Sequence, residues 1–167
     1  LSARPERATK AALTGGKHVF CDKCWILSLE QVNELWTLAE SNGLQLAFDF
    51  SFTHRPVCTL ARKCLEQEIL GTVHSVFIYN AHGALLAGTL PPQFLQTYGG
   101  VLYDIGVHPL YTTLWLLGEP KNLLPVCHTF HHTGICTYHS LLEYPEAVAC
   151  CAGSYCSSES IFSIVLI

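Results

Sequence analysis

The 167-residue chain contains no methionine, few charged residues and no excess of basic ones. Only 13% of its residues are charged and the formal net charge is −4, which argues against a nucleic-acid-binding protein because such proteins present a basic surface. Half of the residues are hydrophobic, so a buried core is expected and extensive disorder is not. Because the chain begins at Leu1 and contains no methionine, we expect it to be a fragment.

Long apolar segments are also missing. The longest purely apolar runs span a few residues, far short of the roughly 20 that a membrane-spanning helix needs. The first ten residues are polar and do not resemble a signal peptide. We therefore expect a cytoplasmic protein without membrane association. Residues 161–167 predict a core strand that stops before its turn, so we expect the chain to be incomplete at its C-terminus too.

Nine cysteines are present, an odd number without the spacing of a disulfide framework. A chain of this size and hydrophobicity does not need covalent cross-links. We interpret the cysteines as reduced and mostly buried residues that act as small hydrophobes, with disulfides as the alternative. Reduced cysteines agree with a cytoplasmic location.

The first 50 residues show the pattern of a helix, a strand, a second helix and a second strand. The clearest helix begins at Ser28, which forms a capping box with Gln31. The strands are expected near residues 18–21 and 44–50. Because strands this close cannot pair in parallel without a crossover, the segment predicts a parallel βαβ unit.

From residue 51 onward the pattern changes. A helix from Pro56 and a strand over residues 73–79 precede a long irregular stretch and a helix that ends at Gly118. Further strands are expected near residues 123–129, 138–144, 147–154 and 161–167. Strands that follow one another without helices predict an α+β domain with an open, mostly antiparallel sheet.

Two short polar motifs contain the candidate functional residues. In the first, a strand ends in Asp22 and Lys23, and ligands of wound α/β sheets bind at the carboxyl ends of strands. In the second, Asp104 and His108 lie four residues apart, and Pro109 places them at the start of a helix. A carboxylate and an imidazole placed in this way can form an acid–base pair. The alternatives are a solvated surface pair and an ordinary helix start.

Together these segments resemble the Gfo/Idh/MocA family of oxidoreductases, which includes glucose–fructose oxidoreductase and inositol dehydrogenase. One segment is similar to the family's GKHVxxEKP motif, and another to its GGGxLxDxGxHPLD…WLLGE motif. A fainter similarity near residues 133–134 and 141–145 points to the dihydrodiol dehydrogenase branch. The matching stretches follow the family's order and comprise residues 16–24, 28–43, 68–76 and 99–119.

The resemblance implies an α/β fold in which residues 1–50 are the C-terminal remnant of a Rossmann-like NAD(P)-binding domain. Residues 51–167 would then be a truncated α+β domain for substrate binding and for homo-oligomer contacts through its open sheet. The implied reaction transfers hydride between NAD or NADP and a hydroxyl or carbonyl group of a sugar, inositol or diol.

The family's motifs also imply roles for single residues. Lys23 matches a lysine that touches the substrate hydroxyl near the nicotinamide, and Asp22 and Lys23 are the expected cofactor contacts. Asp104 matches an acidic residue that helps to hold the substrate. His108 matches the general acid–base residue.

The chain departs from the family pattern at three places. Asp22 and Cys24 replace a glutamate and a proline, and Phe50-Ser-Phe-Thr replaces the FNxR motif. No G-x-G-x-x-G occurs, so the turn that binds the cofactor's pyrophosphate is missing from these residues. We therefore expect this chain to be an inactive fragment. The alternative is a non-catalytic binding or scaffold protein that retains the family fold.

A zinc site is a further alternative. Cys21 and Cys24 have C-x-x-C spacing, and His128, His131 and His132 could supply the remaining ligands. These histidines belong to no second metal signature. No metal site is therefore predicted.

Overall fold

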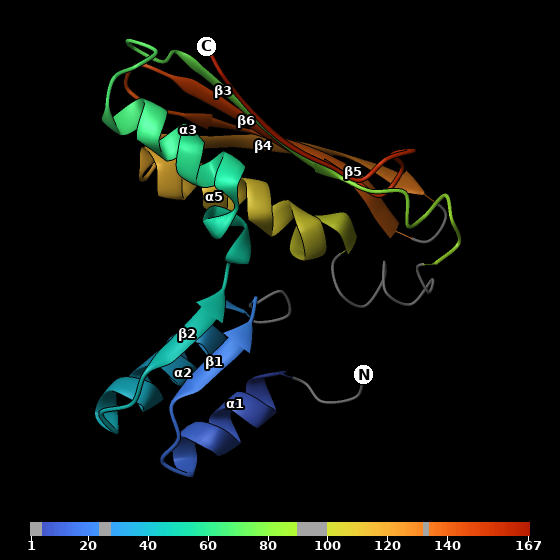
Figure 1. Ribbon diagram of the computed structural model, residues 1–167. Coiled ribbons are helices and arrows are strands. Elements are labelled where there is room, and N and C mark those ends of the chain that lie inside the picture. The colour runs from blue at the N-terminus through green and yellow to red at the C-terminus, as the bar shows by residue number, and fades with distance from the viewer. Residues whose placement is uncertain (1–4, 24–27, 90–99, 132–133) are drawn as a thin grey trace. The chain divides into compact units, whose positions relative to one another are not determined.

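The computed structural model describes residues 5–23, 28–89, 100–131 and 134–167 (Figure 1). The chain forms two compact units, Leu1–Phe50 and Ser51–Ile167. None of the helices formed by the described residues is long and apolar enough to cross a membrane.

The first unit alternates helices and strands, as the hydrophobic pattern predicts. Its elements are α1 (Pro5–Thr14), β1 (Val19–Asp22), α2 (Leu29–Ser41) and β2 (Leu46–Asp49). The two strands pair in parallel. Ser28 caps α2, and its side chain forms the predicted capping box with Gln31. Buried Leu13 and Leu35 join the helices in one small core.

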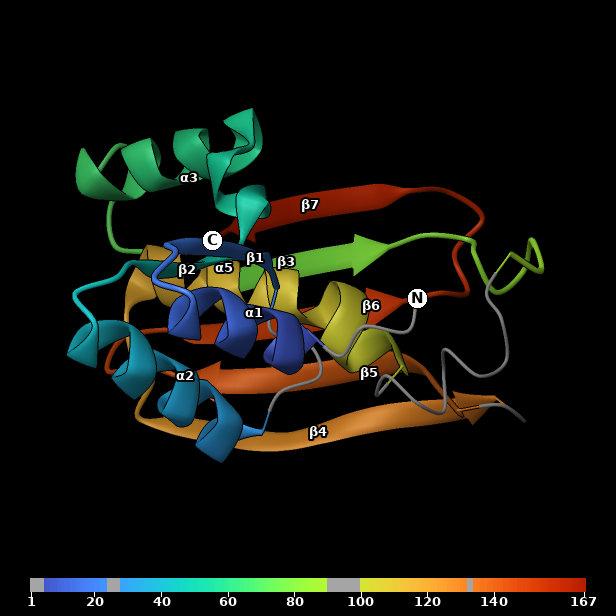
Figure 2. The same cartoon turned by 90° about the horizontal axis from the view of Figure 1, so that it is seen from below.

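The second unit is built on a five-stranded sheet in the order β4-β5-β6-β3-β7 (Figure 2). Its elements are η1 (Ser51–His54), α3 (Pro56–Glu66), β3 (Ser75–Ala81), η2 (Leu102–Gly106), α5 (Val107–Leu117), β4 (Asn122–His131), β5 (Gly134–Glu143), β6 (Val148–Ser154) and β7 (Ile161–Leu166). β3 pairs in parallel with β6, and the other neighbouring strands are antiparallel. The prediction of a mostly antiparallel sheet is confirmed.

The helices α3 and α5 lie on one face of this sheet (Figure 1). Side chains that point toward them form the main core, among them Val76, Ile78 and Leu142, each at most 2% exposed. Alternate residues of the same strands point to the other face and are open to solvent, for example Phe77 at 46%. Within the described part of this unit, no helix covers that second face. The sheet is therefore open on one side, as expected.

Candidate active site

Asp104 and His108 lie in a helical segment with an unusual turn. Residues 100–117 are continuously helical, but Leu102–Gly106 form a π-helical turn that leads into α5. Pro109 is the third residue of α5, in agreement with its predicted place in a first turn, but the helical segment extends back to residue 100, so Asp104 lies in the π-helical turn before α5. π-helical turns within helices are rare and frequently occur at functional sites.

Asn80 joins the sheet to the turn that precedes Pro109. A proline has no N–H, so it cannot donate to the carbonyl oxygen four residues earlier, which belongs to Ile105. That oxygen accepts from the Val107 N–H, and the buried Asn80 Nδ2 on β3 also donates to it, at 3.0 Å. A polar side chain of the sheet thus holds this buried carbonyl in place.

Tyr138 holds the next residue of the turn. Its hydroxyl donates to the Gly106 carbonyl oxygen at 2.9 Å, and its side chain is fully buried in β5. A Cβ added to Gly106 or to Gly153 would lie 2.6 Å from the ring's Cε1 atom, so the ring occupies a slot between two glycines. Burial raises the pKa of Tyr138 far above its ordinary value, so the hydroxyl remains a donor.

Tyr155 holds the carboxylate of Asp104. The residue directly follows β6, is fully buried, and donates from its hydroxyl to Asp104 Oδ2 at 2.7 Å. Burial, and then the negative charge of Asp104, raise the pKa of Tyr155 well above its ordinary range. The phenol therefore remains protonated and orients the carboxylate. The His82 ring lies beside Tyr155, with the ring centroids 5.0 Å apart.

His108 is fixed by aromatic stacking. Its ring is 7% exposed and lies parallel to the Phe52 ring, with centroids 3.7 Å apart. The Arg55 guanidinium carbon lies 3.4 Å from the same Phe52 centroid. Since both groups cannot fit on one face of the ring, Phe52 is sandwiched between Arg55 and His108. This stack sets the plane of the imidazole.

Asp22 and Lys23 lie in the other unit, at the carboxyl end of β1, as predicted. The Lys23 N–H donates to Asp22 Oδ1 at 2.8 Å. Asp22 also faces Asp49 across the parallel ladder, so two carboxylates and one lysine gather at this edge. Asp104 and His108 thus share one helical segment of Ser51–Ile167, and Asp22 and Lys23 share one strand end of Leu1–Phe50. Cys24 lies outside the described residues.

Comparison with known proteins identifies the family. Residues 59–162 match the family model described as GFO/IDH/MocA C-terminal domain. The chain belongs to the Gfo/Idh/MocA family. The resemblance that its sequence motifs indicate is confirmed.

Curated relatives and solved structures agree with this assignment. The chain is 30% identical to the D-glucoside 3-dehydrogenase of Escherichia coli, over 75% of this chain and 36% of that protein. It is 31% identical to the scyllo-inositol 2-dehydrogenase (NADP(+)) IolU of Bacillus subtilis, over 65% of this chain and 34% of that protein. The structure of an inositol dehydrogenase homolog from Azotobacter vinelandii, complexed with NADH and myo-inositol, superposes with a TM-score of 0.81 at 24% identity. That superposition covers 99% of this chain and 47% of the other, whereas the chain spans about a third of the curated relatives.

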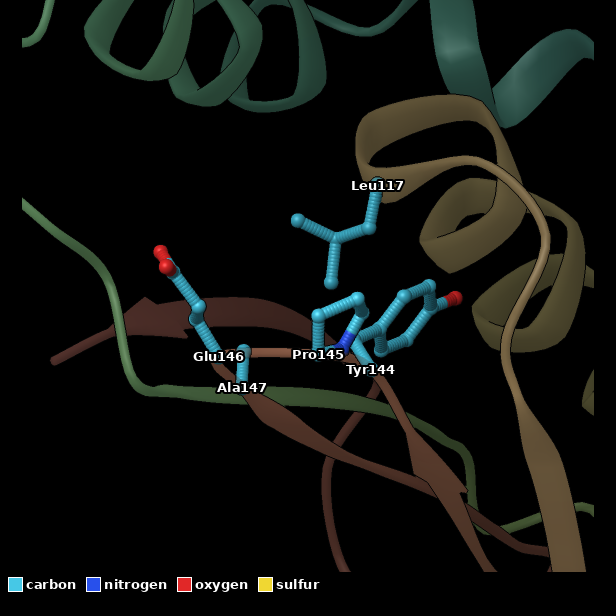
Figure 3. Close-up of a pocket in the computed structure, with 5 residues that line it drawn as sticks. All are labelled: Leu117, Tyr144, Pro145, Glu146 and Ala147. Atoms are coloured by element: carbon cyan, nitrogen blue, oxygen red, sulfur yellow. The ribbon is translucent and has the colours of Figure 1, made fainter.

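One surface pocket of the Gfo/Idh/MocA domain lies away from the candidate residues. It has a volume of about 250 Å³ and is formed by Leu117 and the turn from Tyr144 to Ala147 (Figure 3). Leu117 ends α5, whereas Asp104 precedes its start. The pocket therefore belongs to the opposite end of the helix.

Metal ligation receives no support from the described residues, which contain no group of three or more His, Cys, Asp or Glu side chains that could hold an ion. Two residues of the zinc alternative, Cys24 and His132, lie outside the described residues. The side chains of His128 and His131 are likewise outside the described part.

The positioning residues Asn80, Tyr138 and Tyr155 were not identified from the sequence. Gly106 and Gly153 are signals of close packing. They do not identify Tyr138 as the packing partner, because Tyr138 lies far from Gly106 in the sequence.

Proposed function

We propose that this chain contributes the substrate-facing residues of an NAD(P)-dependent oxidoreductase that acts on a hydroxyl or carbonyl group of a sugar, inositol or diol. The observation that carries the proposal is the π-helical turn, where buried Asn80 and Tyr138 of the sheet and Tyr155, directly after β6, hold the segment that carries Asp104 and His108. The names of the curated relatives, a D-glucoside dehydrogenase and an inositol dehydrogenase, support this class of substrate.

The cofactor fits these residues only in part. Lys23 lies at the carboxyl end of a parallel strand, where the nicotinamide end of a dinucleotide is expected, and Asp22 is its neighbour. The chain contains no G-x-G-x-x-G for the pyrophosphate. When bound, NAD(P) would accept or supply the hydride. Residues 1–50 are accordingly proposed as part of a Rossmann-like domain, and residues 51–167 as the substrate domain.

The proposed roles follow from charge and proton balance. As hydride leaves the carbinol carbon, the hydroxyl proton passes to a nitrogen of His108, whose plane Phe52 fixes. The Lys23 ammonium stabilises the negative charge that develops on the substrate oxygen. Asp104, oriented by Tyr155, accepts a hydrogen bond from a neighbouring substrate hydroxyl.

The first prediction concerns cofactor binding. Without the pyrophosphate turn, this chain alone is expected to bind NAD(P)H more weakly than about 1 mM, equivalent to less than roughly 4 kcal/mol. A fluorescence titration measures this affinity. Joining a glycine-rich phosphate-binding segment to the chain should lower the dissociation constant and restore nicotinamide reduction with inositols, glucosides or diols. Micromolar affinity of the chain alone would contradict the prediction.

The open face of the sheet is proposed as a contact with a second copy of this chain. One apolar residue from each strand forms a continuous row across it, and four of the five are at least 40% exposed. The row consists of Leu124, Leu141, Cys150, Phe77 and Val165 in the order of the strands. An exposed apolar row of this length without a charged residue favours association, because association removes it from solvent.

The second prediction tests this contact. Phe77→Lys places a charge at the centre of the row and is expected to shift the chain from oligomer to monomer, as measured by light scattering. The matched control is Leu60→Lys on α3, where an equally apolar residue is 62% exposed but lies off the sheet. An unchanged oligomeric state in Phe77→Lys, or an equal shift in the control, would rule out the sheet face as the contact.

A non-catalytic scaffold is the second candidate function. It is favoured by Asp22 and Cys24, where the family has glutamate and proline. Retention of Lys23, Asp104 and His108 favours the enzyme. Turnover by the chain joined to a glycine-rich phosphate-binding segment discriminates between the two.

A further inference from the structure

A cation and the His108 imidazole lie on opposite faces of the Phe52 ring. The Arg55 guanidinium carbon is 3.4 Å from the ring centroid on one side, and the imidazole centroid is 3.7 Å from it on the other. His108 is buried, whereas Arg55 is exposed. We propose that Arg55, acting through Phe52, is a positioning residue that favours the neutral imidazole of His108.

Two aromatic rings hold the Arg55 side chain in place. Arg55 is the N-cap of α3, makes no side-chain cap hydrogen bond and is followed by Pro56. The helix itself does not stabilise a cation here, because the helix dipole is positive at its N-terminus. The guanidinium carbon lies instead over Phe52 and 5.4 Å from the ring centroid of Phe162 on β7. The two rings meet edge to face, with centroids 5.0 Å apart.

The charge of Arg55 is not neutralised by an ion pair within the described part of the chain. Arg62, further along α3, differs in this respect because it pairs with Glu66 at 2.7 Å. The Arg55 charge also acts on the buried Cys58 thiol. Burial raises the pKa of Cys58, and the positive charge of Arg55 partly offsets this rise. The field of Arg55 therefore extends into the protein interior.

The buried titratable groups on the elements packed around this helical segment are uncharged at neutral pH. Burial raises the pKa of each of these thiols and phenols, so they remain protonated. They are Cys58 on α3, Tyr138 on β5, Cys151 on β6 and Tyr155 directly after β6. Neither β7 nor the helix-facing side of β3 has a titratable residue. His54 in η1 is exposed, and Asp104 lies one turn before His108. Arg55 and Asp104 thus act on His108 with opposite charges.

Protonation of His108 would place a second cation opposite Arg55. The guanidinium and the imidazole are roughly 7 Å apart through the ring, a distance at which two like charges repel each other. The π face of Phe52 attracts a cation, but Arg55 already draws the π electrons toward the other face. The attraction for a second cation is therefore weakened. This arrangement stabilises the neutral imidazole relative to the imidazolium.

A neutral His108 is the form that the proposed reaction needs. His108 is proposed to accept the proton of the substrate hydroxyl, and only the neutral imidazole can accept it. Arg55 would therefore extend toward lower pH the range in which His108 acts as a base. This consequence rests on the proposed function, whereas the effect of Arg55 on the imidazole does not.

The test is an NMR titration of the histidine side chains in the whole 167-residue chain. The chain has nine histidines, and the signal that disappears in His108→Asn identifies His108. Arg55→Met removes the charge, and we expect it to raise the pKa of His108 by about 0.3–1 at low ionic strength. This difference from the parent should shrink as the salt concentration rises from about 0.01 M to 1 M, because the Debye length falls from roughly 30 Å to 3 Å.

Three further variants separate charge from packing. Arg55→Gln is a second neutral variant and should repeat the effect of Arg55→Met. Arg55→Lys keeps a cation at this position and should leave the pKa of His108 close to that of the parent. Arg62→Met is the matched control, because it removes another α3 guanidinium that lies over an aromatic ring, that of Trp115 at 4.4 Å. It should leave the pKa of His108 unchanged.

Two results of the titration would overturn the proposal. One is a pKa of His108 that is the same in Arg55→Met, Arg55→Gln and the parent. The other is an equal rise in Arg55→Met and Arg55→Lys, since packing rather than charge would then cause it.

Kinetics add a readout in the protein joined to a glycine-rich phosphate-binding segment. Arg55→Met should move the acid limb of the pH profile of kcat to higher pH by the same amount as the pKa of His108. An acid limb that stays in place while the pKa of His108 rises would refute the link between Arg55 and the base. Absence of turnover in the parent would contradict the proposed function, and the titration would still decide the role of Arg55.

Discussion

Lys23→Met is expected to lower turnover by about 10²-fold or more, on the order of 3 kcal/mol of transition-state stabilisation. The experiment needs a protein in which a glycine-rich phosphate-binding segment precedes this chain. Methionine keeps the length of the side chain and removes its charge, so the substrate oxygen loses the ammonium that stabilises it. Steady-state kinetics should show the loss in kcat, while the cofactor dissociation constant remains unchanged.

Two further variants separate the roles of the helical segment in the same protein. His108→Asn should lower turnover and abolish a pH dependence near neutrality, because imidazoles ordinarily titrate in this range. Tyr155→Phe keeps the Asp104 carboxylate and removes only the donor that orients it. We expect it to raise KM more than it lowers kcat, because Asp104 is proposed to hold the substrate. Full turnover in Lys23→Met would contradict the role assigned to Lys23, whereas a parent protein that binds cofactor but shows no turnover would favour the scaffold.

Local sequence signals predicted the first unit well. The capping box of Ser28 and Gln31 and the spacing of apolar residues define α2 within a few positions of the chain. A helix between two strands forms the crossover that parallel pairing needs, and β1 and β2 pair in parallel. Each of these features depends on residues that are neighbours in sequence.

The helical segment around Asp104 shows where such reasoning fails. Pro109 indicates the first turn of α5 but gives no sign that residues 100–106 extend the helix backward. Asn80 donates to the Ile105 carbonyl from a strand 25 residues earlier. Tyr138 and Tyr155 reach the same turn from 32 and 51 residues away. Periodicity within one element contains no information about such partners, so the π-helical turn could not be predicted.

The same limit applies to the sheet. A run of strands without helices predicts antiparallel neighbours, and most pairs are antiparallel. The parallel pairing of β3 with β6 joins strands that are separated by a helix and two further strands. In a similar way, the segment without the FNxR motif supplies Phe52, on which His108 stacks. The residues that depart from the family pattern thus place an aromatic ring against the imidazole.

Gly106→Ala is expected to destabilise the unit Ser51–Ile167 by about 2–3 kcal/mol, as overpacking of a buried site does. The added Cβ would lie 2.6 and 2.9 Å from two ring carbons of Tyr138. The ring is fully buried, and it also packs so closely on Gly153 that a Cβ added there would lie 2.6 Å from its Cε1 atom, which leaves little room for it to shift. Denaturant unfolding at fixed protein concentration measures the free energy of unfolding.

Comparison with two other variants isolates the clash. Tyr138→Phe keeps the ring and removes only the hydrogen bond to the Gly106 carbonyl, so it should cost about 1 kcal/mol. Helix propensity alone would make alanine more stable than glycine by roughly 1 kcal/mol. A net destabilisation by Gly106→Ala therefore means that the clash with Tyr138 costs more than this gain. Tyr138→Leu removes the ring. The losses of unfolding free energy in Gly106→Ala and in Tyr138→Leu, each measured alone, should therefore sum to more than the loss in the double variant. A Gly106→Ala variant as stable as the parent would mean that the Tyr138 ring does not pack closely on Gly106. Tyr138 would then not fix the position of the turn that carries Asp104.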